Sequence, residues 1–207
     1  MLITSVSLPA QTVTKGVDPA PIVPAQAQAK YVPITGKERL TWFLRSTAGV
    51  NSLLVAGPFS AGWGTAFKSP PEYPSNWEGF GQRYGMRLTG VSTSNAMEAS
   101  IGSIWGEDPR YTRAEGAAFK GRVWHVIEMT FVARNREGQI MPAYARYMAI
   151  PGNNFLSNTW RADSEATASR ALFRTAMGFL GRMAGNGFAE FWPDVNRKLF
   201  RRTRSAP

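Results

Sequence analysis

Residues 162–202 read ADSEATASRALFRTAMGFLGRMAGNGFAEFWPDVNRKLFRR, and this stretch decides the fold. We expect a long helix with Asp163 or Ser164 as its N-cap and Glu165 in its first turn. A side-chain oxygen at the N-cap accepts a free backbone N–H, and negative charge in the first turn interacts favourably with the helix dipole. Small residues then recur at every fourth position. They are Gly181, Gly185 and Ala189. This spacing lets two helix backbones approach closely, in lipid and also in soluble bundles.

The same small-residue spacing occurs in two earlier segments. Its members include Gly57 and Ala61 in one segment, and Gly81 and Gly85 in the other. Three segments of this kind predict helices that pack through glycine faces. The fold class that follows is all-α, a bundle of about five or six short helices in a single domain over residues 35–202.

Local signals predict how the domain begins. Thr35 and Glu38 form a capping-box pattern at the start of ITGKERLTWFLRSTAG, so a helix is expected there. The run from Ser46 to Phe67 has no charged residue. Because it also contains Pro58 and several glycines, it suits two short helices broken at Gly57-Pro58 better than a membrane span. They would lie in an interface or pack in a core.

The segment between residues 119 and 152 is ambiguous. Helical spacing favours a helix to about Val132, a loop over 135–138, and a short helix interrupted at Pro151-Gly152. A period of two also fits Val123, His125 and Ile127, which leaves a β-hairpin near 123–150 open.

Both ends of the chain differ in composition from the predicted domain. Residues 1–10, MLITSVSLPA, are apolar and end in small residues, like the remnant of a secretory signal that lacks its basic start. Residues 11–34 are rich in Pro and Ala, as in a disordered linker, and 203–207 form a short tail. This organisation predicts an exported protein.

Composition bounds the chemistry. Lys and Arg number 24 against 14 Asp and Glu, for a net charge of +10, while 12% of residues are aromatic. A basic, aromatic chain suits an anionic membrane surface at least as well as nucleic acid. The absence of Cys excludes disulfides and thiolate catalysis, and a single His excludes paired-histidine metal sites. We therefore expect no cofactor and no metal.

One ionisable pair stands out in the apolar run VWHVIEMTFV. His125 and Glu128 are three residues apart and would face one another across a helical turn. The favoured interpretation is a buried, hydrogen-bonded pair, and the alternative is an acid–base couple. They are the only catalytic candidates in the sequence.

The end of the chain combines an apolar stripe with basic residues. The stripe is Phe188, Phe191, Trp192, Val195 and Leu199, and the basic residues are Arg197, Lys198, Arg201 and Arg202. Pro193 is expected to start a fresh turn. Such a helix is typical of docking to an anionic membrane surface or to an envelope protein. Such a helix could also pack against a second copy of the chain in a homo-oligomer. Nucleic acid is disfavoured as a partner, because binding to it would not require the apolar stripe.

Two motifs carry a resemblance to a known family. The segments Glu107-Asp108-Pro109-Arg110-Tyr111 and Glu190-Phe191-Trp192-Pro193-Asp194, together with the basic end FWPDVNRKLFRR, resemble a family of exported bacterial envelope proteins over residues 36–202. The match is weakest over 139–152. The resemblance implies export and an envelope setting, and it implies no activity and no catalytic residue.

Two functions follow as hypotheses. The first is a non-enzymatic, structural or scaffolding envelope protein that is membrane-associated through its C-terminal helix, in the periplasm or at the outer membrane. The second is a soluble periplasmic enzyme or ligand-binding bundle whose cleft uses Glu128 and His125.

Overall fold

The capping box at Thr35 sets the start of the fold. A computed structural model describes residues 31–201, and its helices and strands all belong to the compact unit that begins at Val32. Thr35 Oγ1 accepts the Glu38 N–H at 3.2 Å, and Glu38 Oε2 accepts the Thr35 N–H at 2.8 Å. Helix α1, Gly36–Ala48, begins there, which confirms the predicted cap. The predicted signal remnant, most of the linker and the tail lie outside the described residues.

The uncharged run stays helical where a break was predicted. A π-helix, η1 (Asn51–Ala56), leads at Gly57 directly into α2, Gly57–Ala66. The predicted break is therefore a change of helix type. Pro58 fits because it stands in the first turn of α2, where a missing N–H costs least.

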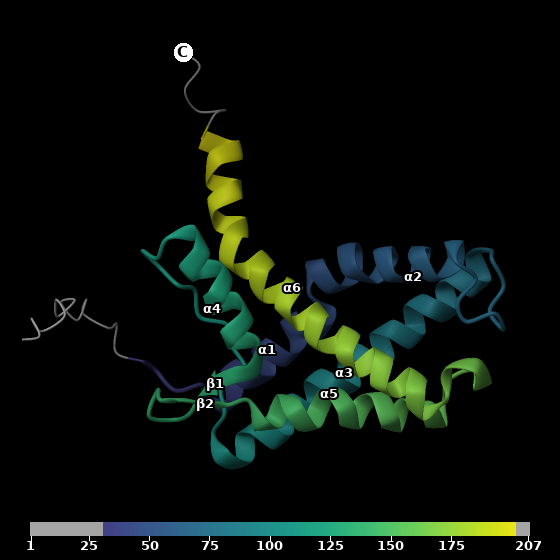
Figure 1. Ribbon diagram of the computed structural model, residues 1–207, viewed down its shortest axis with the longest axis horizontal. Coiled ribbons are helices and arrows are strands. Elements are labelled where there is room, and N and C mark those ends of the chain that lie inside the picture. Colours follow the sequence, from purple (N-terminus) through teal and green to yellow (C-terminus); the bar gives the residue numbers. More distant parts are fainter. Residues whose placement is uncertain (1–30, 202–207) are drawn as a thin grey trace, which may run out of the picture. The chain divides into compact units, whose positions relative to one another are not determined.

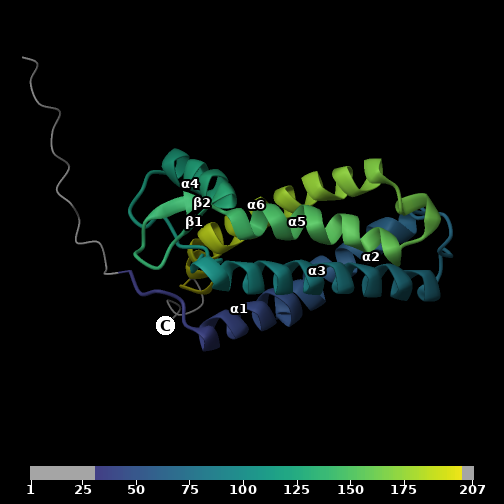
Figure 2. The ribbon, with the colours of Figure 1, turned by 90° about the horizontal axis from the view of Figure 1, so that it is seen from below.

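Helix α3, Trp77–Trp105, contacts more of the bundle than any other described helix. It begins where Asn76 Oδ1 accepts the Gly79 N–H at 3.1 Å, and it ends at Gly106, whose φ of 78° is the left-handed conformation typical of a helix C-terminus. Helices α1, α2 and α5 (Tyr144–Leu156) all contact it. Figure 2 shows α3 between α1 and α5, with α6 (Ala168–Arg201) on the other side of α5.

A helix and a small hairpin precede α5. Helix α4, Phe119–Phe131, ends where β1, Val132–Arg134, pairs antiparallel with β2, Ile140–Pro142. The loop predicted at 135–138 is confirmed, and the hairpin alternative applies only to 132–142. The interruption predicted at Pro151 is wrong, since α5 runs through it. Neighbours of Pro151, among them Ile150 and Asn153, are buried, and this packing on both sides holds the helix together.

Two short 3-10 turns connect α5 to α6. They are η2, Ser157–Thr159, and η3, Asp163–Glu165. The cap predicted at Asp163 or Ser164 is wrong, because α6 starts at Ala168 and Thr167 Oγ1 accepts the Arg170 N–H at 3.3 Å. No fresh turn begins at Pro193, which lies inside α6. Figure 1 shows α6 passing from α5 to α4, both of which it contacts.

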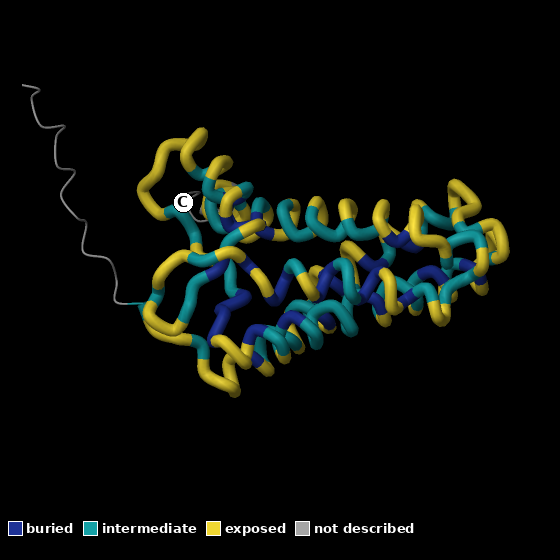
Figure 3. The backbone as a smooth tube through the Cα atoms, turned by 60° about the horizontal axis from the view of Figure 1, so that its bottom comes forward, coloured by how far each residue is buried: buried dark blue, intermediate teal, exposed yellow. Residues whose placement is uncertain are grey.

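The described chain is thus an all-α bundle with one small antiparallel hairpin, as predicted. Its interior is unusual in composition. The buried apolar residues are mostly alanines, accompanied by Val126, Met129 and Ile150. Buried charged residues lie among them, and Figure 3 shows the buried positions gathered where helices face one another.

The predicted glycine faces are only partly inward. Gly57 and Ala61 are buried against α3, where a Cβ on Gly57 would crowd the Tyr84 ring. The other four glycines are different. A Cβ at Gly81, Gly85, Gly181 or Gly185 would meet nothing within 4 Å. Their assignment to helix crossings of this chain is therefore wrong, because these glycines lie on the exposed sides of α3 and α6.

Candidate functional site

The pair predicted between His125 and Glu128, whether a buried hydrogen-bonded pair or an acid–base couple, does not form. His125 Nε2 lies 2.8 Å from the Thr112 carbonyl oxygen, and because a carbonyl only accepts, the histidine donates this bond. Glu128 is exposed, and no hydrogen bond or ion pair of its side chain lies within the described residues. Histidine is held to the loop before α4 while the carboxylate faces solvent. The catalytic candidates therefore share no site in this structure.

Instead, the two sequence motifs of the family resemblance meet at Glu190. This glutamate is fully buried on α6. Its Oε2 accepts the Tyr111 hydroxyl at 2.8 Å and the Ala114 N–H at 3.1 Å, while its Oε1 accepts Arg122 Nε. Arg122 Nη2 also donates to Asp194 at 2.6 Å. The cluster fastens the loop after α3 to the C-terminal half of α6.

Hydrogen bonding decides the charge state of this cluster. Burial, the largest single effect, raises the pKa of Glu190, but the bonds from Arg122, Tyr111 and Ala114 outweigh it and hold the pKa below its ordinary value. Burial and the Glu190 carboxylate together raise the pKa of Tyr111. Both groups thus keep the protonation states that the hydrogen bonds need, as expected for a structural network rather than a proton-transfer site.

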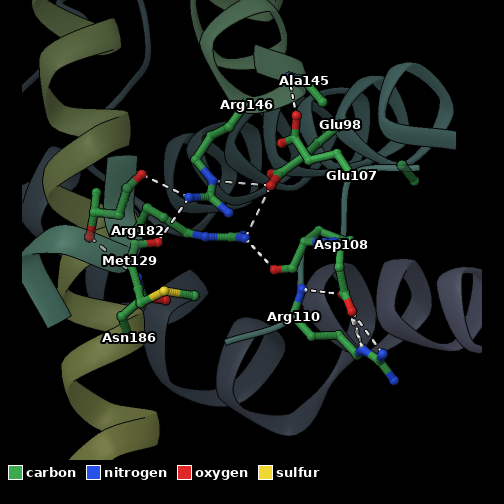
Figure 4. Close-up of polar contacts among 12 residues, drawn as sticks. Glu98, Glu107, Asp108, Arg110, Met129, Ala145, Arg146, Arg182 and Asn186 are labelled. Carbon is green, nitrogen blue, oxygen red and sulfur yellow. Dashed lines mark hydrogen bonds and ion pairs between the residues drawn. The ribbon is translucent and has the colours of Figure 1, made fainter. Parts of the chain in front are cut away.

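A second buried cluster centres on Glu98 of α3 (Figure 4). Glu98 Oε1 accepts Arg146 Nε and Arg182 Nη2, each at 3.1 Å. Arg146 also donates to the Met129 and Thr130 carbonyls at 3.0 and 2.7 Å, which satisfies the end of α4. Burial lowers the pKa of Arg182 to about 10, although Glu98 opposes this. The cluster joins α3, α5 and α6.

Glu107 supports the same junction from the loop after α3. Its Oε2 accepts the Ala145 N–H at 2.8 Å and Trp105 Nε1 at 3.2 Å. The carboxylate thus serves as the missing cap of α5, at the positive end of the helix dipole. Asp108 accepts Arg110 Nη2 at 2.7 Å. Both acids of the first motif are engaged by the protein itself.

The charges that point inward leave an apolar outer face on α6. We call this surface the α6 outer face, and its large members are Leu172, Phe173, Met177, Leu180, Phe188, Trp192 and Val195, all exposed. The inner face carries Arg174, Gly178, Arg182, Asn186 and Glu190 at every fourth position. Between Arg170 and Arg197, the exposed positions carry no charge. The helix is inverted relative to an ordinary amphipathic helix of a water-soluble bundle.

The predicted docking residues are partly on this face. Phe188, Trp192 and Val195 are exposed there, and Arg197 and Lys198 follow them in the exposed last turns. Phe191 is instead half-buried, with its ring 5.5 Å from the Phe119 ring and 4.7 Å from the Arg122 guanidinium. The side chains of Leu199 and Arg201, and all of Arg202, lie outside the described part of the chain.

A second apolar ridge runs along the uncharged segment. Val55, Phe59, Trp63 and Phe67 are exposed at every fourth position from η1 through α2. The Trp63 ring lies 6.0 Å from Phe59 and 4.6 Å from Phe67. Since the buried side of this segment is Ser52, Gly57 and Ala61, the inversion extends beyond α6.

The comparisons with known proteins give no relative for this arrangement: no family model, no curated protein and no solved structure matches the chain. The resemblance of the two motifs to an envelope family stays a prediction. Among residues 31–201, no group of acidic or histidine side chains could hold a metal ion. In the same range, none of the helices has both the length and the apolar character needed to cross a membrane.

Sequence reasoning missed the buried charges at Glu98, Arg146 and Arg182. One signal was available on α6, where the polar residues Arg182, Asn186 and Glu190 are spaced four apart and therefore lie near one another on the helix surface. The prediction for this helix was based on its glycines and aromatic residues, and it did not take this polar stripe into account. For Glu98 and Arg146 we find no local pattern that would have indicated burial.

Proposed function

We propose that this protein is a non-enzymatic helical protein that lies on a membrane surface through the α6 outer face, in a structural or scaffolding role. The observation that carries the proposal is the inversion of α6: its charged residues between Arg170 and Arg197 are buried or partly buried in ion pairs, and most of its large apolar residues are exposed. Exposed large apolar side chains gathered along one helix in this number mark an interaction site. The resemblance to exported envelope proteins, and the predicted signal remnant, support an envelope location.

The composition of the face favours lipid as the occupant. Over about 40 Å of helix it offers aromatic and aliphatic side chains with no exposed charge for a protein partner to pair. Phe188 and Trp192 precede Arg197 and Lys198 on the same helix. Aromatic residues bordered by cations are typical of helices in the interface of anionic membranes.

Two contributions to binding are comparable in size. Phe188, Trp192 and Val195 are 42%, 46% and 44% exposed, so covering each one is worth about 1 kcal/mol. Arg197 and Lys198 add about 1 kcal/mol each near an anionic surface. The two contributions differ in their dependence on salt, because only the charges are screened.

Vesicle binding tests the proposal. Changing Phe188, Trp192 and Val195 to Ser is expected to weaken binding to anionic vesicles by about a hundredfold at every salt concentration. Changing Arg197 and Lys198 to Glu should weaken binding most at low salt and leave binding to neutral vesicles unchanged. The measurement is cosedimentation with vesicles of phosphatidylcholine, with and without phosphatidylglycerol.

The matched control changes Leu40 and Leu44 of α1 to Ser, since both are exposed apolar residues on another element. This variant should bind nearly as well as the wild type. Equal loss in both apolar variants would mean that no particular face is used. A wild type that ignores all vesicles, yet binds duplex DNA with a steep salt dependence, would assign the basic end to nucleic acid and reject the membrane proposal.

A further inference from the structure

We propose that a small cavity beside Arg161 binds a phosphate-type oxyanion. The cavity has a volume of about 150 Å³ and lies where α2, α3 and the turns between α5 and α6 meet. Ser60, Ser69, Tyr73, Arg83, Arg161 and Glu165 are among the residues that line it. The proposal is independent of the α6 outer face, none of whose residues lines this cavity.

Arg161 has more hydrogen-bond donors than partners. Its Nε donates to Ser157 Oγ at 3.0 Å. Within residues 31–201, no group accepts a hydrogen bond from either of its terminal nitrogens. No carboxylate of the described chain lies within ion-pair distance of it. Burial, and then the charge of Arg174, lower the pKa of Arg161, as expected for a guanidinium whose charge is poorly compensated.

Arg83 brings a second positive charge to the cavity wall. This buried guanidinium donates to four backbone carbonyls, those of Ser69, Pro70, Tyr73 and Pro74, at 2.8 to 3.0 Å. The carbonyls hold its geometry but carry no net negative charge. They also fix the loop that forms one side of the cavity, so this wall is preorganised before any ligand arrives.

The one carboxylate in the wall is already engaged. Glu165 Oε2 lies 3.3 Å from Arg174 Nη1, and its Oε1 lies 3.9 Å from Arg170 Nη1. The cavity wall therefore holds two guanidinium groups, Arg83 and Arg161, and one carboxylate that already faces Arg174, while the nearby Glu72 carboxylate bonds Ser164 outside the wall. A bound anion would balance the excess charge, and the guanidinium fork of Arg161 matches two oxygens of a phosphate.

Size selects a small ligand. Sites for drug-sized molecules occupy about 300–1,000 Å³, well above this cavity. A single phosphate group fits the scale, either as free phosphate or as the headgroup of a lipid. The shared chemistry is the doubly charged oxyanion, and the experiment separates the two sources.

The direct test is a titration with inorganic phosphate at constant ionic strength, in which isothermal calorimetry measures binding. We expect saturable binding to the full-length wild type, and binding weaker by about tenfold to a hundredfold in Arg161→Gln, because charge-assisted bonds are lost. Arg170→Gln is the matched control: Arg170 is more exposed, and it does not line the cavity, so phosphate binding should persist. Arg161→Lys keeps the charge without the fork and should fall between wild type and Arg161→Gln.

Two further arms complete the test. If Arg161→Gln does not fold, the wild type is treated with an arginine-specific reagent instead. Mass spectrometry then measures whether phosphate protects Arg161 from modification. Vesicles of phosphatidylcholine with and without phosphatidic acid identify a lipid source, for which the Arg161→Gln loss should appear with phosphatidic acid alone. Equal effects of phosphate on the wild type and on Arg161→Gln would reflect general salt stabilisation and overturn the proposal, as would no binding in either arm.

Discussion

At Gly79 the backbone of α3 passes so close to the preceding loop that a side chain cannot fit. A Cβ built there would collide with the Pro74 carbonyl oxygen, whereas one at Gly85, on the same helix, would meet nothing within 4 Å. We predict that Gly79→Ala lowers the free energy of unfolding by about 1–3 kcal/mol, because backbone cannot move aside as a side chain can. Gly85→Ala should raise it by about 0.5–1 kcal/mol, since alanine loses less entropy in a helix.

Urea unfolding of both variants beside the wild type measures these differences. A loss of stability in Gly85→Ala would contradict the conclusion that this side of α3 is exposed. It would indicate that a second copy of the chain packs against Gly85. At this scale the sequence was informative only in part. The i, i+4 spacing correctly indicated helices, but it could not tell which glycines face inward, because that depends on where neighbouring helices lie. Gly57 and Gly85 have the same local signal and opposite surroundings.

Between elements, the bundle is joined by charges where most bundles use leucine. Glu98 of α3 forms ion pairs with the buried Arg146 of α5 and the mostly buried Arg182 of α6. We predict that Glu98→Gln lowers the free energy of unfolding by about 3–5 kcal/mol, because it leaves two buried cations without a counter-ion. Glu78→Gln, at an exposed position in the first turn of α3, is the control and should cost about 1 kcal/mol or less.

Chemical denaturation of both variants provides the comparison. Equal, small effects would mean that Arg146 and Arg182 are compensated by backbone carbonyls alone. The helices themselves were predictable from caps and periodicity, as at Thr35, whose bonds are local. The Glu98 cluster was not, since its three members are brought together only when α3, α5 and α6 pack. Where local signals misled, as at Pro151 and Pro193, tertiary contacts kept the helix intact.

Over parts of the described unit, apolar and charged residues have exchanged their usual places, although more charged residues are exposed there than buried. Trp63 and Phe59 on α2, Trp124 on α4 and Phe173 on α6 are more than half exposed, while Glu98, Glu107 and Glu190 are buried. Burial of apolar side chains inside the bundle therefore contributes less to its stability than usual. A partner that covers the outer surface would bury additional apolar area. The proposed lipid contact follows from this exchange rather than from any single residue.

This exchange makes a prediction for the intact protein. In buffer without lipid, the folded chain should bind the dye ANS and self-associate, although it retains near-UV circular dichroism and unfolds cooperatively. Dye binding by a well-packed protein distinguishes exposed native surface from a molten globule, which loses its near-UV signal. Anionic vesicles should lower the dye fluorescence and favour the monomer, because lipid covers the same faces. Light scattering and fluorescence measure both effects, with the triple Ser variant of Phe188, Trp192 and Val195 as the comparison. A protein that is monomeric in buffer and binds no dye would show that these side chains cover one another in solution, and the inverted surface would then need no partner.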